Sequence, residues 1–140
     1  MSYVEEYKRI IAETQYIALA TSVNNSPNVR VVNYCWDKSK GNRIYICTFM
    51  ERAKTEEFML NPIVSFTTIP TSGSEQVRVT NARVKKSERS VYDFASLFVT
   101  KYPSYKEFIE NCGNVLDIYE ISFEKASVVA GVGKKEVITF

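Results

Sequence analysis

Short apolar runs separated by polar turns dominate the first half of the chain. Residues 16–23, 29–36 and 43–49 are rich in Val, Ile, Tyr and Thr and lack helical spacing, which is typical of strands. The polar segments 24–28 and 37–42 contain Asn, Pro or Gly, the residues that favour turns. Three strands joined by two short turns predict an antiparallel meander.

Other segments of the chain carry apolar residues at helical spacing. The spacing predicts helices over residues 4–13, 51–60, 91–101 and 105–112. Capping boxes, in which a Ser precedes a Glu by three residues, are expected at Ser2 before the first helix and at Ser104 before the last. Pro residues close the second and third helices because they cannot continue a helical ladder.

The remaining apolar segments predict further strands over residues 63–69, 76–85, 116–129 and 134–140. Together the pattern predicts a single α+β domain over residues 1–140. It is mainly β, with a six- or seven-stranded antiparallel sheet and helices inserted between strand pairs. A sheet this long in so short a chain is expected to curl into a barrel, because closure removes exposed strand edges.

Composition and charge narrow the classes of function. Apolar residues make up 45% of the 140 residues and charged residues 24%, with a formal net charge of +2. Acidic and basic residues are interspersed, so no basic stripe for nucleic acid or a membrane surface is expected. No apolar run is long enough to span a bilayer, and the first residues lack a signal-peptide core. We therefore expect a cytoplasmic protein with three reduced cysteines.

The chain contains no histidine. This absence removes Ser–His and Cys–His nucleophile systems, most zinc sites and a histidine-ligated haem. No metal site is expected. If the protein performs chemistry near neutral pH, a cofactor is expected to supply the reactive group, while the protein supplies position and charge.

A candidate anion site lies where the strand 43–49 meets the following helix. Thr48, Arg52 and Lys54 cluster at this junction, and a helix start adds free backbone N–H groups and a positive dipole end. Arg30, in the neighbouring strand, is placed to reach the same anion. The alternative is that Arg52 and Lys54 are solvated charges that pair with acidic residues of the helix, namely Glu51, Glu56 or Glu57.

The stretch RVVNYCWDKSKGNRIYICTFMERAKTEEFMLNP resembles the FMN-binding split barrels related to pyridoxamine 5′-phosphate oxidase. The shared pattern is an Arg within a strand, a strand that ends in Thr, a Lys six residues later, and a helix closed by Leu-Asn-Pro. The flanking segments IALATSVNNSPNVRVV and SEQVRVTNARVKK also resemble family strands. The resemblance covers residues 16–86.

The resemblance implies a split β-barrel that binds flavin mononucleotide (FMN) as a homodimer, with the flavin at the subunit interface. By position, Arg30, Thr48 and Lys54 would hold the phosphate, and Arg52 would substitute for a basic residue that relatives carry where this chain has Ala53. The residues implied to contact the rest of the flavin are Val31, Val32, Asn33 and Cys47, together with Gln76 from the neighbouring subunit.

Three classes of function are compatible with this resemblance. The leading hypothesis is an FMN-dependent oxidoreductase or flavin-reductase-like protein, acting on a small substrate or electron donor. A second is a flavin- or haem-binding storage or sensor protein without turnover, and a third is a ligand-free interaction module. Oxidation of pyridoxamine phosphate ranks lower, because the family's enzymes use a C-terminal segment with Trp and Arg, whereas here the last Arg is Arg89 and the single Trp is Trp36.

Overall fold

The strand-rich segments form one antiparallel sheet in the computed structural model, which describes residues 2–140. Hydrogen-bonded neighbours follow the order β2-β1-β5-β6-β7-β4-β3, and β8 leaves the edge of β6 to form a hairpin with β9. The strands are β1 (Tyr16–Val23), β2 (Ser26–Asn33), β3 (Cys35–Trp36), β4 (Arg43–Phe49), β5 (Ile63–Thr68), β6 (Gln76–Lys86), β7 (Leu116–Ser122), β8 (Lys125–Gly131) and β9 (Lys134–Thr139).

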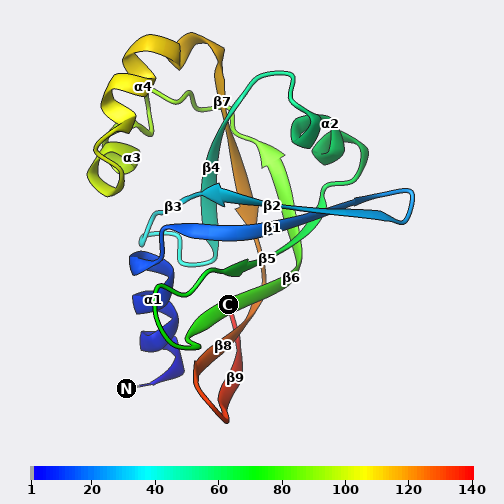
Figure 1. Cartoon of the computed structure of the whole chain (residues 1–140), viewed down its shortest axis with the longest axis vertical. Coiled ribbons are helices and arrows are strands. Elements are labelled where there is room, and N and C mark those ends of the chain that lie inside the picture. The colour runs from blue at the N-terminus through cyan, green and yellow to red at the C-terminus, as the bar shows by residue number, and fades with distance from the viewer. Residues whose placement is uncertain (1) are drawn as a thin grey trace.

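The sheet closes on itself through β2 and β3. These two strands stand at opposite ends of the pairing order, yet only Tyr34 separates them in the chain. One nearly continuous strand therefore joins both edges of the sheet, so that β1 to β7 enclose a barrel (Figure 1). The α+β split-barrel prediction is confirmed. Nine strand segments replace the six or seven expected, because the strand predicted over residues 116–129 is divided at Phe123 and Glu124 and the one over residues 29–36 at Tyr34.

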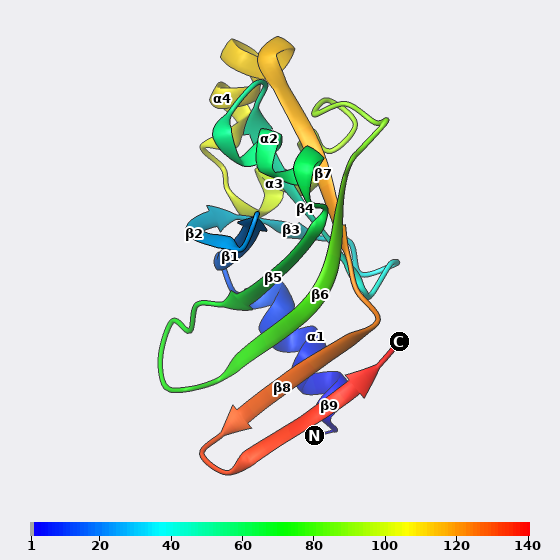
Figure 2. The ribbon, with the colours of Figure 1, turned by 90° about the vertical axis from the view of Figure 1, so that its right-hand side faces the viewer.

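Residues 2–140 also form four α-helices. They are α1 (Tyr3–Glu13), α2 (Ala53–Leu60), α3 (Ala95–Lys101) and α4 (Tyr105–Cys112), and a short 3-10 turn over Gly113–Val115 follows the last of these. Both ribbon views place α2, α3 and α4 at one end of the molecule and the β8–β9 hairpin at the other (Figures 1 and 2). Helix α1 packs against β6 and β8.

Local signals explain where the elements begin. Ser2 and Glu5 form the predicted capping box. Asn24 and Asn25 both have positive φ angles, 51° and 63°, so two residues suffice to turn β1 into β2, as in a type I′ hairpin. Strand β2 consequently starts at Ser26, earlier than expected. It tolerates Pro27 because it lies at an end of the pairing order.

Two predictions in the helical region are wrong. The helix expected from Val91 begins only at Ala95, because residues 90–94 form turns in which Asp93 accepts a hydrogen bond from the Ser90 amide. Val91 is nonetheless buried, as its spacing implied. Ser104 makes no side-chain cap because its backbone is already helical, with φ −63° and ψ −17°, whereas a capping Ser is extended.

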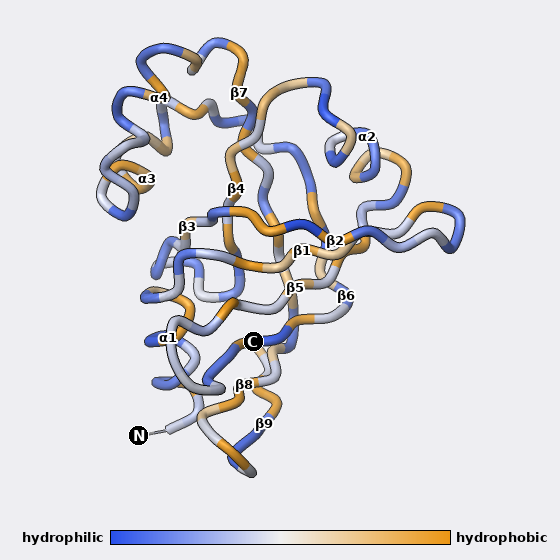
Figure 3. Tube along the Cα trace, in the orientation of Figure 1, coloured by the Kyte–Doolittle hydropathy of each residue, from blue (hydrophilic) through white to orange (hydrophobic). Residues whose placement is uncertain are grey.

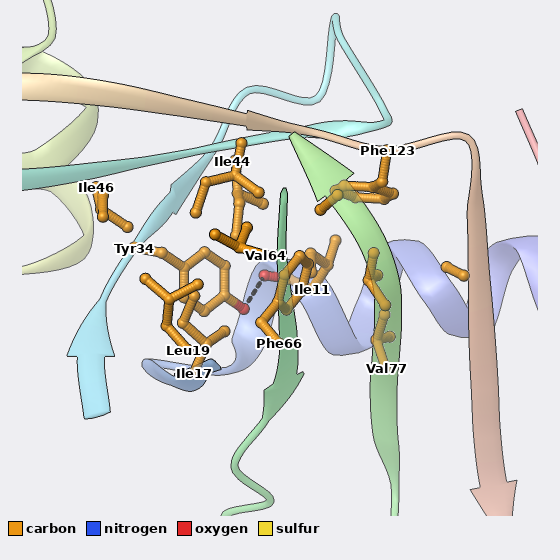
Figure 4. Packing of buried hydrophobic residues seen from close by; sticks show 14 of the residues in the cluster. Ile11, Ile17, Leu19, Tyr34, Ile44, Ile46, Val64, Phe66, Val77 and Phe123 are labelled. Atoms are coloured by element: carbon orange, nitrogen blue, oxygen red, sulfur yellow. Dashed lines mark hydrogen bonds between the residues drawn. The ribbon is translucent and has the colours of Figure 1, made fainter. Parts of the chain in front are cut away.

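Two apolar clusters make up the core. The larger fills the barrel, where Ile11 from α1, Ile17 and Leu19 from β1, and Tyr34 between β2 and β3 pack together (Figure 4). The Tyr34 hydroxyl donates to the Ile11 carbonyl at 2.6 Å, so its polar tip is satisfied inside the core. The smaller cluster lies between α3, α4 and the outer face of β4. Figure 3 shows the resulting hydrophobic stretch along β4. No helix among residues 2–140 is long and apolar enough to cross a membrane.

The buried Tyr102 hydroxyl, just after α3, forms hydrogen bonds to residues next to the barrel strands. Its removal is expected to lower the stability of the protein. It contacts the carbonyl oxygens of Gln15 at 2.7 Å and Tyr34 at 2.6 Å, and it accepts from the Tyr34 amide at 3.2 Å. We expect Tyr102→Phe to lower the free energy of unfolding by about 1–3 kcal/mol, because buried backbone groups lose their partner. Urea denaturation measures this change.

Tyr92→Phe is the matched control for this substitution. Tyr92 is 59% exposed, so loss of its hydroxyl is expected to change stability by less than about 0.5 kcal/mol. Equal stabilities for the two variants would mean that the Tyr102 contacts contribute nothing.

Candidate functional site

The chain turns sharply between β4 and α2. Glu51 has a φ of 56°, in the left-handed region that residues with a side chain seldom adopt. Thr55 fixes the start of α2, since its hydroxyl accepts from the Arg52 amide at 3.0 Å and donates to the Arg52 carbonyl at 2.7 Å. The amides of Ala53 and Lys54 open the helix and have no intrahelical acceptor.

A pocket of about 330 Å³ lies at this turn. We call it the β4–α2 pocket, and its lining residues are Arg30, Thr48, Phe49, Arg52, Ala53 and Lys54. The structure therefore brings together the four residues in which the sequence predicted an anion site. Arg30 and Thr48 come from strands β2 and β4, while Arg52 and Lys54 come from the start of α2. Its volume is at the lower end of the roughly 300–1,000 Å³ of small-molecule sites.

Of the two terminal nitrogens of the Arg30 guanidinium, one has hydrogen-bond acceptors and the other does not. Its Nη2 donates to both carboxylate oxygens of Glu57, at 3.0 and 3.1 Å. Its Nη1 is buried and has no hydrogen-bond partner among the described residues. A buried guanidinium nitrogen without an acceptor costs free energy, and an anion in the pocket would supply that acceptor. The orphaned nitrogen therefore fits a phosphate or carboxylate ligand.

Glu57 lies next to this pocket and pairs with Arg30. From the sequence, it was an alternative partner for Arg52 or Lys54. Besides Arg30, it accepts hydrogen bonds from Thr21 at 3.1 Å and from Asn28 at 3.1 Å. Its desolvation raises the pKa of the carboxyl, but the hydrogen bonds from Arg30 and Asn28 outweigh this effect and the net pKa is lowered. Glu57 lies three residues after Lys54 on α2, a spacing that puts both on one helix face.

The other two cations have no acidic partner. No ion pair among residues 2–140 involves Arg52 or Lys54, so the alternative that they pair with Glu51, Glu56 or Glu57 is not what the structure shows. Burial, followed by the charge of Arg30, lowers the pKa of Lys54. The Arg52 guanidinium lies 5.0 Å from the centroid of the Phe49 ring. The pocket thus concentrates positive charge that a dianion would neutralise.

The residues implied to line the flavin ring lie on different faces. Val31 is 60% exposed and points outward, whereas Val32 packs against the barrel core. Asn33 lies near α4, where its Oδ1 accepts from the Tyr105 hydroxyl at 3.5 Å. Cys47 faces the smaller cluster, on the side of β4 opposite Thr48, and burial raises the pKa of its thiol to about 12.

Gln76 does not line the β4–α2 pocket. It opens β6 at the end of that strand away from α2 (Figure 1), and its Oε1 accepts from the Thr67 hydroxyl at 3.0 Å. Strand register places it on the outer face of the sheet, as Val77 is fully buried on the inner face.

This outer face carries apolar and small residues. Val29 and Val31 of β2 are 65% and 60% exposed, and they pair with Ala20 and Ala18 of β1. Ala18 in turn pairs with Thr67 of β5. Val29 and Val31 are thus two apolar side chains that the single chain leaves largely uncovered.

Residues 10–135 match the family model described as pyridoxamine 5′-phosphate oxidase-like. Among curated proteins, none is close enough in sequence to count as a relative. A haem-binding protein from Mycobacterium smegmatis aligns with 99% of this chain at 17% identity and a TM-score of 0.80, and the alignment covers 58% of that protein.

Two further solved structures align over most of their own length. A FAD-binding protein from Mesorhizobium loti matches 99% of this chain and 95% of its own at 16% identity, with a TM-score of 0.68. General Stress Protein 26 from Bacillus anthracis matches 100% of both chains at 14% identity, with a TM-score of 0.76. At these identities the similarity establishes the fold.

Proposed function

Because this chain belongs to the pyridoxamine 5′-phosphate oxidase-like family, we propose that it is a flavoprotein that binds FMN through the β4–α2 pocket. The observation that carries the proposal is the buried Nη1 of Arg30, which has no partner in a pocket that already holds two unpaired cations. A phosphate monoester satisfies all three groups at once. The single cluster also favours FMN, with its one terminal phosphate, over a dinucleotide.

Four residues of the pocket would hold that phosphate, each in a different way. Arg30 would donate from Nη1 while Glu57 keeps its guanidinium in place through Nη2. Thr48 would offer its hydroxyl, and Lys54 would contribute a charge and the free amide at the helix start. Arg52, stacked near Phe49, would close the solvent side.

The pocket is large enough for the phosphate end of the cofactor, so the flavin ring would lie along the adjoining strand β2. We propose that a second copy of the chain covers the ring, with the outer faces of β2, β1 and β5 in contact. Gln76 lies on that outer face and outside its own chain's β4–α2 pocket, which is consistent with a contact made across the interface. The proposed assembly is a homodimer with two shared sites.

Bound flavin would supply hydride or electron transfer at its ring, and we propose an oxidoreductase or flavin-reductase-like activity. The chain's own contribution would be binding, orientation and exclusion of water. Burial keeps the nearby Cys47 thiol and Tyr105 hydroxyl in their neutral forms, since it raises the pKa of both. Neither group is a strong base at neutral pH, so the protein is expected to rely on the cofactor for its reactivity.

Haem is the second candidate, because a protein of the same fold is described as haem-binding. Without histidine, the axial ligand would have to be Tyr, Cys or Met. Burial raises the pKa of Tyr34 and Tyr102, and it also raises that of Cys35 to about 12. A raised pKa disfavours the phenolate or thiolate form, so these three residues are poor candidates for the axial ligand.

Parallel titrations with FMN, FAD and haemin test the proposal. We expect FMN to bind with a dissociation constant in the micromolar range or below and to show a perturbed flavin spectrum, with FAD weaker because the pocket accepts one terminal phosphate. Bleaching of the bound flavin by NADH or NADPH would support turnover. Two results together would identify haem instead of flavin as the cofactor. They are a Soret band with stoichiometric haemin and no calorimetric heat when FMN is added at high micromolar concentration.

A further inference from the structure

A second pocket, of about 600 Å³, lies beside α3. We call it the α3 pocket. The end of α1, strand β3, the loop before α3 and α3 itself form its walls, and it shares no lining residue with the β4–α2 pocket. Trp36, Phe94 and Leu97 provide an apolar lining. A pocket of this volume with apolar walls and a few polar groups has the character of a small-molecule site.

Two cations line this pocket without acidic partners. Lys101 donates to the Tyr34 carbonyl at 3.2 Å, and its Nζ lies 3.8 Å from the centroid of the Tyr34 ring. The Arg89 guanidinium lies 4.5 Å from the centroid of the Phe94 ring. Neither Lys101 nor Arg89 takes part in an ion pair within residues 2–140.

Among residues 2–140, no carboxylate forms an ion pair with Lys101. Burial lowers the pKa of its ammonium group to about 8. Cys35 lines the same pocket, but burial raises the pKa of its thiol to about 12, so it is neutral and provides no counter-charge. A ligand that brought one negative charge next to Lys101 would stabilise the ammonium form.

The carboxylates of the pocket limit how much negative charge it accepts. Asp37 accepts hydrogen bonds from the amide and hydroxyl of Ser39, at 3.0 and 2.7 Å, and Asp93 accepts from the Ser90 amide at 2.9 Å. Both are thus held by their own turns rather than by Lys101. The hydrogen bonds from Ser39, with smaller contributions from the charges of Lys40 and Arg89, lower the pKa of Asp37. Asp37 and Asp93 bring the formal net charge of the lining to zero, so a dianionic phosphate would be repelled more strongly than a monoanion.

We propose that the α3 pocket binds a small apolar monocarboxylate whose acid group is received by Lys101 and Arg89. The hydrocarbon body of the ligand would lie against Trp36, Phe94 and Leu97. This site shares no lining residue with the proposed flavin site, so each of the two proposals can be tested without the other.

Trp36 provides a direct readout, because it lines the pocket and is the only tryptophan of the chain. Three ligands with the same benzyl body are compared by tryptophan fluorescence and calorimetry: phenylacetate, neutral phenylacetamide and dianionic benzylphosphonate. We expect saturable binding of phenylacetate, with the amide and the phosphonate each at least about tenfold weaker. The full chain is titrated both free of flavin and saturated with FMN, and both forms should respond.

Substitutions assign the binding to this pocket. Lys101→Met and Arg89→Met should each weaken phenylacetate by about 10- to 100-fold, the effect of losing one charged hydrogen bond, without altering FMN affinity. Lys106→Met, in an exposed residue outside the pocket, should leave it unchanged. The proposal is overturned if phenylacetate shows no saturable binding at millimolar concentration, if the three ligands bind equally, or if both pocket variants bind as tightly as the unmodified chain.

Discussion

Replacing Lys54 by methionine is expected to weaken FMN binding by roughly 10- to 100-fold while leaving the ligand-free protein as stable as before, or more so. The loss of affinity follows from the contribution of a charged hydrogen bond, about 1.5–3 kcal/mol. The stability follows from the pKa of Lys54, which burial and the charge of Arg30 lower. Methionine keeps most of the apolar stem and removes the charge.

The sign of the stability effect can be worked out from protonation. In the unfolded chain Lys54 has an ordinary lysine pKa, and in the folded chain the pKa is lower. Below the folded pKa both states are protonated, and the folded state carries the less favourable ammonium group. This cost is present below the folded pKa and is relieved as the pH rises through it. Methionine removes the cost at neutral pH, so the ligand-free melting temperature should not fall.

Arg30→Ala provides the contrast. It should weaken FMN by a similar 10- to 100-fold, but it should also destabilise the ligand-free protein, because Glu57 loses its ion pair at 3.0 Å. Lys85→Met serves as the control for both variants, since Lys85 lies on β6 outside the pocket and is expected to change neither property. Calorimetry with FMN and thermal melts of the ligand-free forms give the two readouts.

The outcome that contradicts the site is specific. If Lys54→Met, Arg30→Ala and Lys85→Met all bind FMN as tightly as the unmodified chain, the cations of the β4–α2 pocket have no part in flavin binding. If Lys54→Met instead lowers both affinity and stability, Lys54 is a structural residue and the argument from its lowered pKa fails.

The sequence predicts the β4–α2 cluster because the cluster is mostly local. Thr48, Arg52 and Lys54 fall within seven consecutive residues, and a strand that runs into a helix brings such residues together with little help from the rest of the fold. Arg30 joins them through one neighbouring strand. Its position within an apolar strand is the signal, since a half-buried strand seldom carries a charged residue.

The partner of Arg30 depends on geometry that sequence spacing does not contain. Glu57 was a plausible partner for Lys54 because the two are three residues apart on α2, yet its carboxylate turns to Arg30, Thr21 and Asn28 instead. Which of two cations a carboxylate reaches is decided by how α2 packs on β1 and β2. That packing is a tertiary property, and helical periodicity alone cannot supply it.

The α3 pocket lies beyond sequence reasoning for the same reason. Cys35, Arg89 and Lys101 are far apart in the chain and meet only because α3 returns to the outer side of β3. The spacing predicts the helix itself, but it predicts a start at Val91, four residues before Ala95. The apolar residues Val91 and Phe94 kept helical spacing while the intervening Asp93 stabilised a turn.

Introducing a charge at Val31 is expected to abolish the proposed dimer and, with it, most of the flavin affinity. Val31 is 60% exposed on the outer face of β2, so a single chain should tolerate Val31→Asp. Two such faces packed together would bury an unpaired carboxylate on each side, at a cost of several kcal/mol. Light scattering with and without FMN measures the mass of the assembly.

Two companion variants separate the dimer from a simple surface effect. Val132→Asp places the same charge on a residue that is 95% exposed in the turn between β8 and β9, and it should leave mass and flavin affinity unchanged. Gln76→Ala should weaken FMN although Gln76 does not line its own chain's β4–α2 pocket, because the residue would act from the partner. FMN should in turn stabilise the dimer, since a ligand held by both chains favours the state that binds it. A monomer mass with FMN fully bound would rule out the shared site and leave a pocket built from one chain.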